Sequence, residues 1–286
     1  MAESNSFPVT HLSWRETRRE ANWDLPDAEK WGLHRAHYPE LVGETFTAHM
    51  VQLPSSQSVP ERTSDASVVY VGVKGELEFR IGEERIVVGP RDVLTVPNGL
   101  PHSCANHDFE SALFVSVTTT AEEDDASALS GPHLLPWMDY RRQFRSAILP
   151  HAMEYGHHRL SAPHTPLRSL LGHTVRIPTN QASPWHGIPR DLLFVQFSGE
   201  VEFSLAGRKC LLEPYDLMLV RARTPYSYAN FGTEDGLFFD IGGRILVQGE
   251  TSTYYESDPG WPINPEVGTY KIVTDDPAFR AIYGSR

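Results

Sequence analysis

The sequence has few cysteines, no long apolar run and no excess of basic residues. Two cysteines in 286 residues are too few for a disulfide framework and are typical of a reducing compartment. No apolar run reaches the roughly 18 residues of a membrane-spanning helix, and the first residues form no apolar signal core. The formal net charge is −12, without a basic patch. We therefore expect a cytoplasmic protein that binds neither a membrane nor nucleic acid.

Glycine and proline, by contrast, are abundant and evenly spread. The chain has 21 glycines and 22 prolines, and between them lie short β-rich runs such as "ASVVYVGV", "DVLTVP" and "ALFVSV". Short strands separated by turn residues predict a β-sandwich or β-barrel. Helical periodicity is weak outside two Arg-rich segments near 14–22 and 137–147.

The sequence repeats itself. "VYVGVKGELEF" at 69–79 returns as "LFVQFSGEVEF" at 193–203, an offset of 124 residues. The offset holds without a gap when 31–106 is aligned with 155–230, where 21 of 76 pairs are identical. The segment "WRETRRE" also has a counterpart in "WMDYRRQ", one residue out of step. An internal duplication of one β-domain explains this pattern.

The stretch "PNGLPHSCAN" at 97–106 is similar to the second motif of the cupin superfamily, Pro-x-Gly-x-x-His-x-x-x-Asn. Gly75 and Gly199 match the glycine that closes the first cupin motif. The chain thus resembles a bicupin, which implies an all-β fold of two tandem jelly-roll barrels, with short helical segments before each. We predict an N-terminal segment (1–30), barrel 1 (31–120), an acidic linker with a helical segment (121–154), barrel 2 (155–245) and a C-terminal tail (246–286).

The resemblance also implies a metal site, built from His-x-His and Glu of the first motif and His of the second. Counting back from Gly75 places the glutamate position on Val68. The first histidine position falls on Arg62, or on Glu61 with the longer spacing. Of the four ligands, the first half therefore keeps His102, with Glu61 as one further candidate.

The second half departs further from the metal motif. Counting back from Gly199 places the glutamate position on Leu192 and the histidines on His186 and Ile188. The histidine of the second motif is Tyr226. Because stable transition-metal sites need about three protein ligands or more, we expect no cofactor. An Fe, Mn or Zn site with unusual ligands would use His49, Glu61 and His102, or His173, His186 and Tyr226.

His49 and His173 correspond to each other and share a strand face with apolar residues, including Val51 and Val175. This face is expected to point into the barrel. The two histidines would then be hydrogen-bonded core residues, or else ligands of the unusual site.

The positions at which the halves differ are the candidates for function. The second half has an imidazole, phenols, an indole and two guanidinium groups, which suit a small organic anion. We predict His186 and Tyr226 as acid–base groups, and as ligand-binding residues Trp185, Arg221, Arg223 and Tyr228. Two alternatives stay open. The tyrosines could simply fill the barrel while the arginines lie in water, or the first barrel could act, with His102 as base and Arg62 as anion clamp.

The sequence is consistent with three functions. The leading one is a metal-independent lyase or isomerase on a small polar or acidic metabolite, as resemblance to the carbohydrate epimerases of the superfamily implies. The alternatives are an Fe- or Mn-dependent dioxygenase with a non-standard ligand set and a non-enzymatic ligand-binding or regulatory protein. Because "VVYVGV" is apolar on both faces, its outer face must be covered by the other half or by a second chain. We expect a homodimer.

Overall fold

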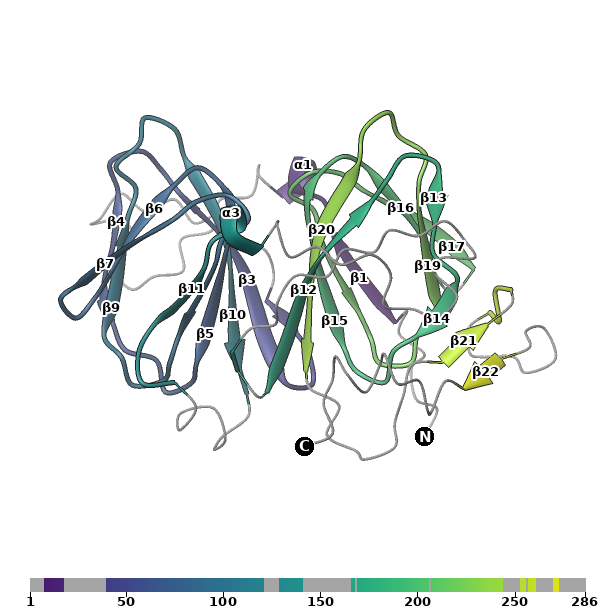
Figure 1. The fold of residues 1–286 in the computed structure, drawn as a ribbon, viewed down its shortest axis with the longest axis horizontal. Coiled ribbons are helices and arrows are strands. Elements are labelled where there is room, and N and C mark those ends of the chain that lie inside the picture. The colour runs from purple at the N-terminus through teal and green to yellow at the C-terminus, as the bar shows by residue number, and fades with distance from the viewer. Residues whose placement is uncertain are drawn as a thin grey trace.

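Two β-barrels lie side by side in the computed structural model of the chain (Figure 1). The structure describes residues 8–17, 40–120, 129–140, 166–167, 169–205, 207–243, 253–255, 257–260 and 270–272. Within these ranges no helix is long and apolar enough to cross a membrane. The predicted domain boundaries stay predictions, since most fall outside the described residues.

The first barrel consists of two facing sheets. Its strands are β2 (Leu41–Val42), β3 (Phe46–Leu53), β4 (Ser58–Arg62), β5 (Val68–Lys74), β6 (Leu77–Ile81), β7 (Glu84–Val88), β8 (Val93–Val96), β9 (His102–Ala105), β10 (Ala112–Thr119) and β11 (His133–Leu135). One sheet has the order β11-β8-β5-β10-β3-β2 and the other the order β4-β9-β6-β7.

The second barrel repeats this plan. Its strands are β12 (Leu170–Ile177), β13 (Gln181–Ala182), β14 (Trp185–Gly187), β15 (Leu192–Ser198), β16 (Val201–Leu205), β17 (Arg208–Leu212), β18 (Leu217–Val220), β19 (Tyr226–Asn230) and β20 (Gly236–Gly243), joined by β1 (Val9–Leu12), β21 (Thr253–Tyr255) and β22 (Tyr270–Ile272). One sheet has the order β1-β18-β15-β20-β12. The other follows β17-β16-β19-β14-β21-β22, with β13 beside β19. The prediction of two duplicated all-β barrels is confirmed.

Each barrel includes one strand from the segment that precedes the other barrel in the chain. β1 precedes the first barrel in the chain but pairs with β18 of the second, and β11 precedes the second but pairs with β8 of the first. An aspartate carboxylate holds each crossing, buried in the second barrel and partly buried in the first. Asp216 accepts a hydrogen bond from the Trp14 backbone N–H at 2.8 Å, and Asp92 accepts one from Trp137 at 2.6 Å. These tryptophans begin α1 (Trp14–Thr17) and α3 (Trp137–Tyr140), so the described start of each predicted helical segment is helical, and the remainder of the predicted segments lies outside the described residues.

Three apolar cores follow from the alternation along the strands. Val68 and Tyr70 of β5 point into the first barrel. Val69 and Val71 point the other way, into a core shared with residues of the second barrel such as Leu193. A third core fills the second barrel. The outer face of "VVYVGV" is therefore covered by the other half of the same chain, one of the two predicted solutions, and the homodimer stays a prediction.

Candidate functional site

A chain of hydrogen bonds crosses the first barrel where the second-motif histidine lies. Arg62 Nη2 donates to the Tyr70 hydroxyl at 2.9 Å. That hydroxyl lies 2.6 Å from Nε2 of His102, and His102 Nδ1 lies 2.9 Å from the Leu100 carbonyl oxygen. Tyr70 and His102 are almost completely buried, whereas Arg62 is partly exposed. The chain thus runs from the surface to the interior.

The chemistry of these groups sets the direction of each bond. A carbonyl only accepts, so His102 Nδ1 carries the proton and donates to Leu100. Burial is the main cause that lowers the pKa of His102 below its ordinary value. The Leu100 carbonyl is the next-largest effect and raises the pKa, followed by the charge of Arg62, which lowers it, and by Glu61, which raises it. His102 is therefore neutral at pH 7, and its bare Nε2 accepts the proton of Tyr70.

Strand register brings these side chains together. Arg62 of β4 lies directly opposite His102 of β9, after an irregularity between Val59 and Arg62. His102 and Cys104 alternate inward along β9, while Ser103 points outward. Tyr70 comes from β5 in the facing sheet. Sequence analysis predicted His102 and Arg62 but missed Tyr70, although the alternation of Tyr70 with inward-facing Val68 was a usable signal.

The second barrel holds a different set at the same places. His186 of β14 lies opposite Tyr226 of β19, as Arg62 lies opposite His102. Their ring centroids are 4.3 Å apart, and Tyr228 stands edge-on to His186 at 5.9 Å. Phe194, which corresponds to Tyr70, packs on Tyr226 at 5.7 Å. With Phe203 and Phe238 these rings form one contiguous buried cluster. The structure thus brings His186, Tyr226 and Tyr228 together in a closely packed interior, and their catalytic role stays a prediction.

The other ligand-binding residues predicted for the second half lie elsewhere. Trp185 is on the face of β14 opposite to buried His186. Arg221 Nη1 donates to the Asp191 carboxylate at 2.8 Å and to the Val42 carbonyl at 2.7 Å, which ties the second barrel to β2 of the first. Arg223 is an exposed turn residue with φ of +62°. None of the three belongs to the ring cluster, because each side chain leaves from an outer face or a loop.

The paired histidines have taken different partners. His173 is buried, and its Nδ1 lies 2.8 Å from the carboxylate of Asp240, its neighbour across β12 and β20. In the first barrel the corresponding positions are His49 and Ser116, and His49 contacts Glu40 at 3.5 Å with part of its side chain exposed. Sequence analysis did not single out Asp240, although a carboxylate inside "LFFDIGG" was the visible signal.

Neither unusual metal set is assembled by the described residues. Glu61 is exposed on the outer face of β4, whereas His102 points into the barrel and His49 turns toward Glu40. The irregularity in β4 places Arg62, not Glu61, opposite His102. Over the described parts of the chain, no three His, Cys, Asp or Glu side chains gather closely enough to hold a metal ion. The residues that the structure describes therefore do not fit a cupin metal centre.

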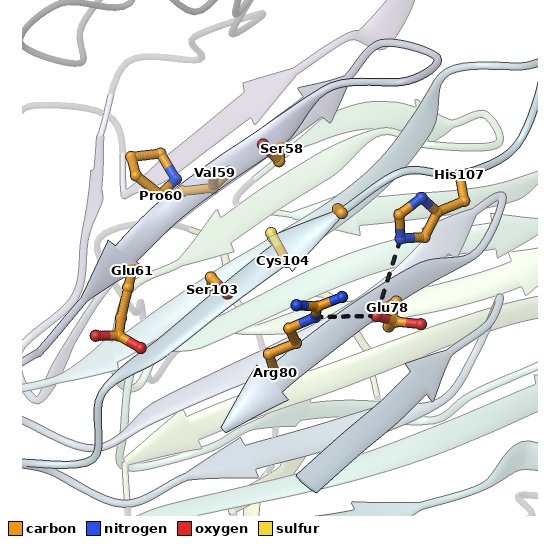
Figure 2. A pocket seen from close by; sticks show the side chains of 10 residues that line it. Ser58, Val59, Pro60, Glu61, Glu78, Arg80, Ser103, Cys104 and His107 are labelled. Atoms are coloured by element: carbon orange, nitrogen blue, oxygen red, sulfur yellow. Dashed lines mark hydrogen bonds and ion pairs between the residues drawn. The ribbon is translucent and has the colours of Figure 1, made fainter. Parts of the chain in front are cut away.

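Glu61 instead lines an open groove on the outer face of the first barrel (Figure 2). The groove has a volume of about 320 Å³ and runs over β4, β9 and β6. Across it from Glu61, the Glu78 carboxylate pairs with Arg80 at 3.3 Å and lies 3.9 Å from His107. Because its charged groups are exposed and largely paired with one another, we assign the groove no role.

Comparison with known proteins identifies relatives of this architecture. Residues 48–118 match the family model of the cupin domain. No curated protein matches the sequence. A salicylate 1,2-dioxygenase from Pseudoaminobacter salicylatoxidans, solved as adducts with gentisate, superposes with a TM-score of 0.66 at 12% identity over 93% of this chain and 85% of the other. A structure named as a putative glyoxylate-induced protein from Pseudomonas aeruginosa superposes with a TM-score of 0.59. The identity is 16%, over 73% of this chain and 78% of the other. At these identities the likeness establishes the fold.

The comparisons correct one prediction. We expected no cofactor, but the similar structures include salicylate 1,2-dioxygenases. A dioxygenase reacts with O₂ through a metal or an organic cofactor, because O₂ does not react readily with ordinary side chains. The expectation of no cofactor is therefore contradicted, although the described side chains supply no three-ligand set.

Proposed function

Because this chain belongs to the cupin superfamily and has the two barrels of a bicupin, we propose that it binds a small aromatic carboxylate at the mouth of its first barrel. The observation that carries the proposal is the hydrogen-bonded chain of Arg62, Tyr70 and His102. The ligand class comes from the similar salicylate 1,2-dioxygenase, solved with gentisate, since salicylate and gentisate are both hydroxylated aromatic carboxylates.

Each residue of the chain has a distinct part in binding. Arg62 is partly exposed and uses one terminal nitrogen on Tyr70, so its other N–H groups can take a carboxylate at the barrel mouth. The Tyr70–His102 bond holds the guanidinium in place from below, which reduces the entropy that binding would otherwise cost. The rings of Tyr70 and Phe79, 4.8 Å apart, belong to the apolar core behind Arg62.

An imidazole, a phenol and a guanidinium are groups that a lyase or an isomerase can use for acid–base chemistry. Neutral His102 accepts the hydrogen bond of Tyr70, and Arg62 donates to the same hydroxyl. Burial and the charge of Arg62 lower the pKa of His102, which opposes transfer of the Tyr70 proton to it. The comparisons, however, favour the dioxygenase alternative over a lyase or isomerase.

Titration calorimetry of the full chain with salicylate and with gentisate tests the binding proposal. Removing a charge-assisted contact costs about 1.5–3 kcal/mol, so Arg62→Gln should weaken binding about 10- to 100-fold. The matched control is Arg80→Gln, on the outer face of the same barrel, which should bind as the wild type does. Absence of binding at millimolar ligand would refute the proposal. Binding that survives Arg62→Gln and is lost in Tyr226→Phe would move the site to the second barrel.

Aromatic ring cleavage is the second candidate function, favoured by the dioxygenases among the similar structures. The described residues include no set of side chains that could hold a metal ion, so the proposal assigns no metal-dependent step to them. Oxygen uptake with salicylate or gentisate, measured before and after incubation of the protein with Fe(II), tests this candidate. Uptake that depends on both ligand and iron would support it, and ligand binding without uptake would leave the binding function alone.

Assembly and location complete the proposal. We infer a cytoplasmic location from the composition, and the homodimer stays a prediction, because the two barrels of one chain already cover each other's apolar faces. Light scattering at micromolar concentration measures the mass directly, and a monomer would refute the dimer.

A further inference from the structure

Two loops close one end of the second barrel, and a backbone hydrogen bond holds them together. One loop joins β14 to β15 and contains Arg190, and the other joins β18 to β19 and contains Thr224. The Arg223 N–H donates to the Ile188 carbonyl oxygen at 2.6 Å. Arg190 and Thr224 therefore belong to the same mouth of the barrel.

Arg190 is a buried arginine without a carboxylate partner among the residues that the structure describes. The residue is 7% exposed, its Nη1 donates to the Gly243 carbonyl oxygen at 3.1 Å, and its Nε is buried without a hydrogen-bond acceptor in those residues. The adjacent Asp191 does not neutralise it, because that carboxylate accepts from Arg221 Nη1 at 2.8 Å and from the Ala222 N–H at 2.7 Å. A buried guanidinium without an anion is costly, because burial removes the water that would otherwise stabilise its charge.

The hydroxyl of Thr224 is a second buried polar group at this mouth. Thr224 is 1% exposed, and its Oγ1 makes no hydrogen bond within the described ranges of the chain. Buried hydroxyls and guanidinium groups nearly always have a hydrogen-bond partner in folded proteins. Two such groups in adjoining loops therefore point to a bound partner that accepts hydrogen bonds.

The first barrel shows that the fold does not require these polar groups. The offset of 124 residues relates Arg190 to Ala66 and Thr224 to Leu100, and Leu100 packs on the core of the first barrel. The backbone hydrogen bond between the two loops is present in both barrels. The second half thus has a guanidinium and a hydroxyl where an alanine and a leucine are sufficient for the fold.

The guanidinium lies against the rim of the second core. A Cβ added to Gly242 would lie 3.4 Å from Arg190 Nε and 2.7 Å from Cδ2 of Leu192, which belongs to that core. The interior beyond it is filled by rings such as those of Phe194 and Tyr226, 5.7 Å apart. A ligand at this mouth must therefore be a few atoms in size.

We propose that Arg190 and Thr224 bind a small carboxylate, of the size of acetate, at the mouth of the second barrel. Because Nη1 donates to Gly243, the guanidinium presents Nε and Nη2 on one planar edge, and their parallel N–H groups match the two oxygens of a carboxylate. The Thr224 hydroxyl is a further donor to the same anion. A tetrahedral anion such as phosphate fits this planar edge and narrow mouth less well. The site is separate from the one proposed in the first barrel, and neither depends on the other.

Thermal unfolding of the full chain in sodium acetate and in sodium chloride of equal ionic strength tests the proposal. Every sample carries Arg62→Gln, so that the site proposed in the first barrel contributes little. At about 50 mM acetate and a Kd of about 1 mM, the melting temperature should be about 3–6 °C higher than in chloride. Arg190→Met keeps the apolar stem but removes the guanidinium, and it should abolish this difference. Arg176→Gln, at an exposed arginine of β12, is the matched control and should retain it.

Thr224→Val is a second test, which decides the matter if Arg190→Met does not fold. In chloride it should melt no lower than its parent, because it removes a buried hydroxyl that the described residues leave without a partner. Acetate should then raise its melting temperature by less than it raises that of the parent. The proposal is overturned if acetate and chloride give the parent the same melting temperature, or if phosphate stabilises it as strongly as acetate does. It is also overturned if either Arg190→Met or Thr224→Val, when folded, retains the full effect of acetate.

Discussion

Replacing Tyr70 with phenylalanine removes one oxygen from the centre of the first barrel and leaves its ring in place. That oxygen accepts from Arg62 at 2.9 Å and donates to His102 Nε2 at 2.6 Å. Arg62 is partly exposed, so water can replace its lost acceptor. His102 is 2% exposed, so its Nε2 would be left buried without its proton donor.

The expected cost follows from these two bonds. A buried polar atom left unsatisfied costs about 1–3 kcal/mol, and an ordinary hydrogen bond contributes about 1 kcal/mol. Allowing for water at Arg62, Tyr70→Phe should lower the free energy of unfolding by about 2–3 kcal/mol. The same position in the second barrel is Phe194, so the fold accepts a phenylalanine ring there.

Urea unfolding followed by circular dichroism at pH 7 measures this cost. Tyr215→Phe makes the same chemical change at a residue whose ring packs edge-on against Trp14, and it should cost less than about 0.5 kcal/mol. In a double-mutant cycle, Tyr70→Phe and His102→Leu should show a coupling energy of about 1–2 kcal/mol. A loss below about 0.5 kcal/mol for Tyr70→Phe, or additive single costs, would refute the reasoning, because the Tyr70–His102 bond would then contribute nothing.

Three further predictions concern stability. Asn106 makes three side-chain hydrogen bonds in the first barrel and Asn230 makes the matching three in the second, so Asn106→Ala and Asn230→Ala should each cost about 3–4 kcal/mol in urea unfolding; a cost under 1 kcal/mol would contradict this. Gly199 has φ of +64° and a methyl group there would lie 2.5 Å from the Asp235 carbonyl oxygen, so Gly199→Ala should lower the melting temperature, at a cost of about 2–3 kcal/mol. Burial lowers the pKa of His11, but its hydrogen bond to Asp216 and weaker contacts outweigh this and raise the pKa to about 10, so its contribution is complete below the unfolded value of 6.5 and is lost as the pH rises toward 10; the stability difference between wild type and His11→Leu should shrink over that range, and a constant difference would contradict the raised pKa.

The sequence by itself determined the class of fold and its duplication. Short β-branched runs between glycines and prolines predict strands, because turn residues set the ends of each run. The offset of 124 residues relates the two halves position by position, and it also relates Asn106 to Asn230 and Asp92 to Asp216. It did not show what these pairs do. The two asparagines close a loop in each barrel, and the two aspartates hold the crossing segments.

Tertiary structure alone decided which side chains meet. The alternation along a strand predicts two faces but neither the neighbouring strand nor the register, and one residue of slip exchanges the faces. The irregularity after Val59 is such a slip: it places Arg62 opposite His102 and leaves Glu61 outside. Contacts between distant segments, such as that of His11 with Asp216, depend on a strand exchange between the barrels that no local pattern encodes. Local periodicity thus sets the strands, while the candidate site depends on long-range pairing, which is determined only when the whole chain packs.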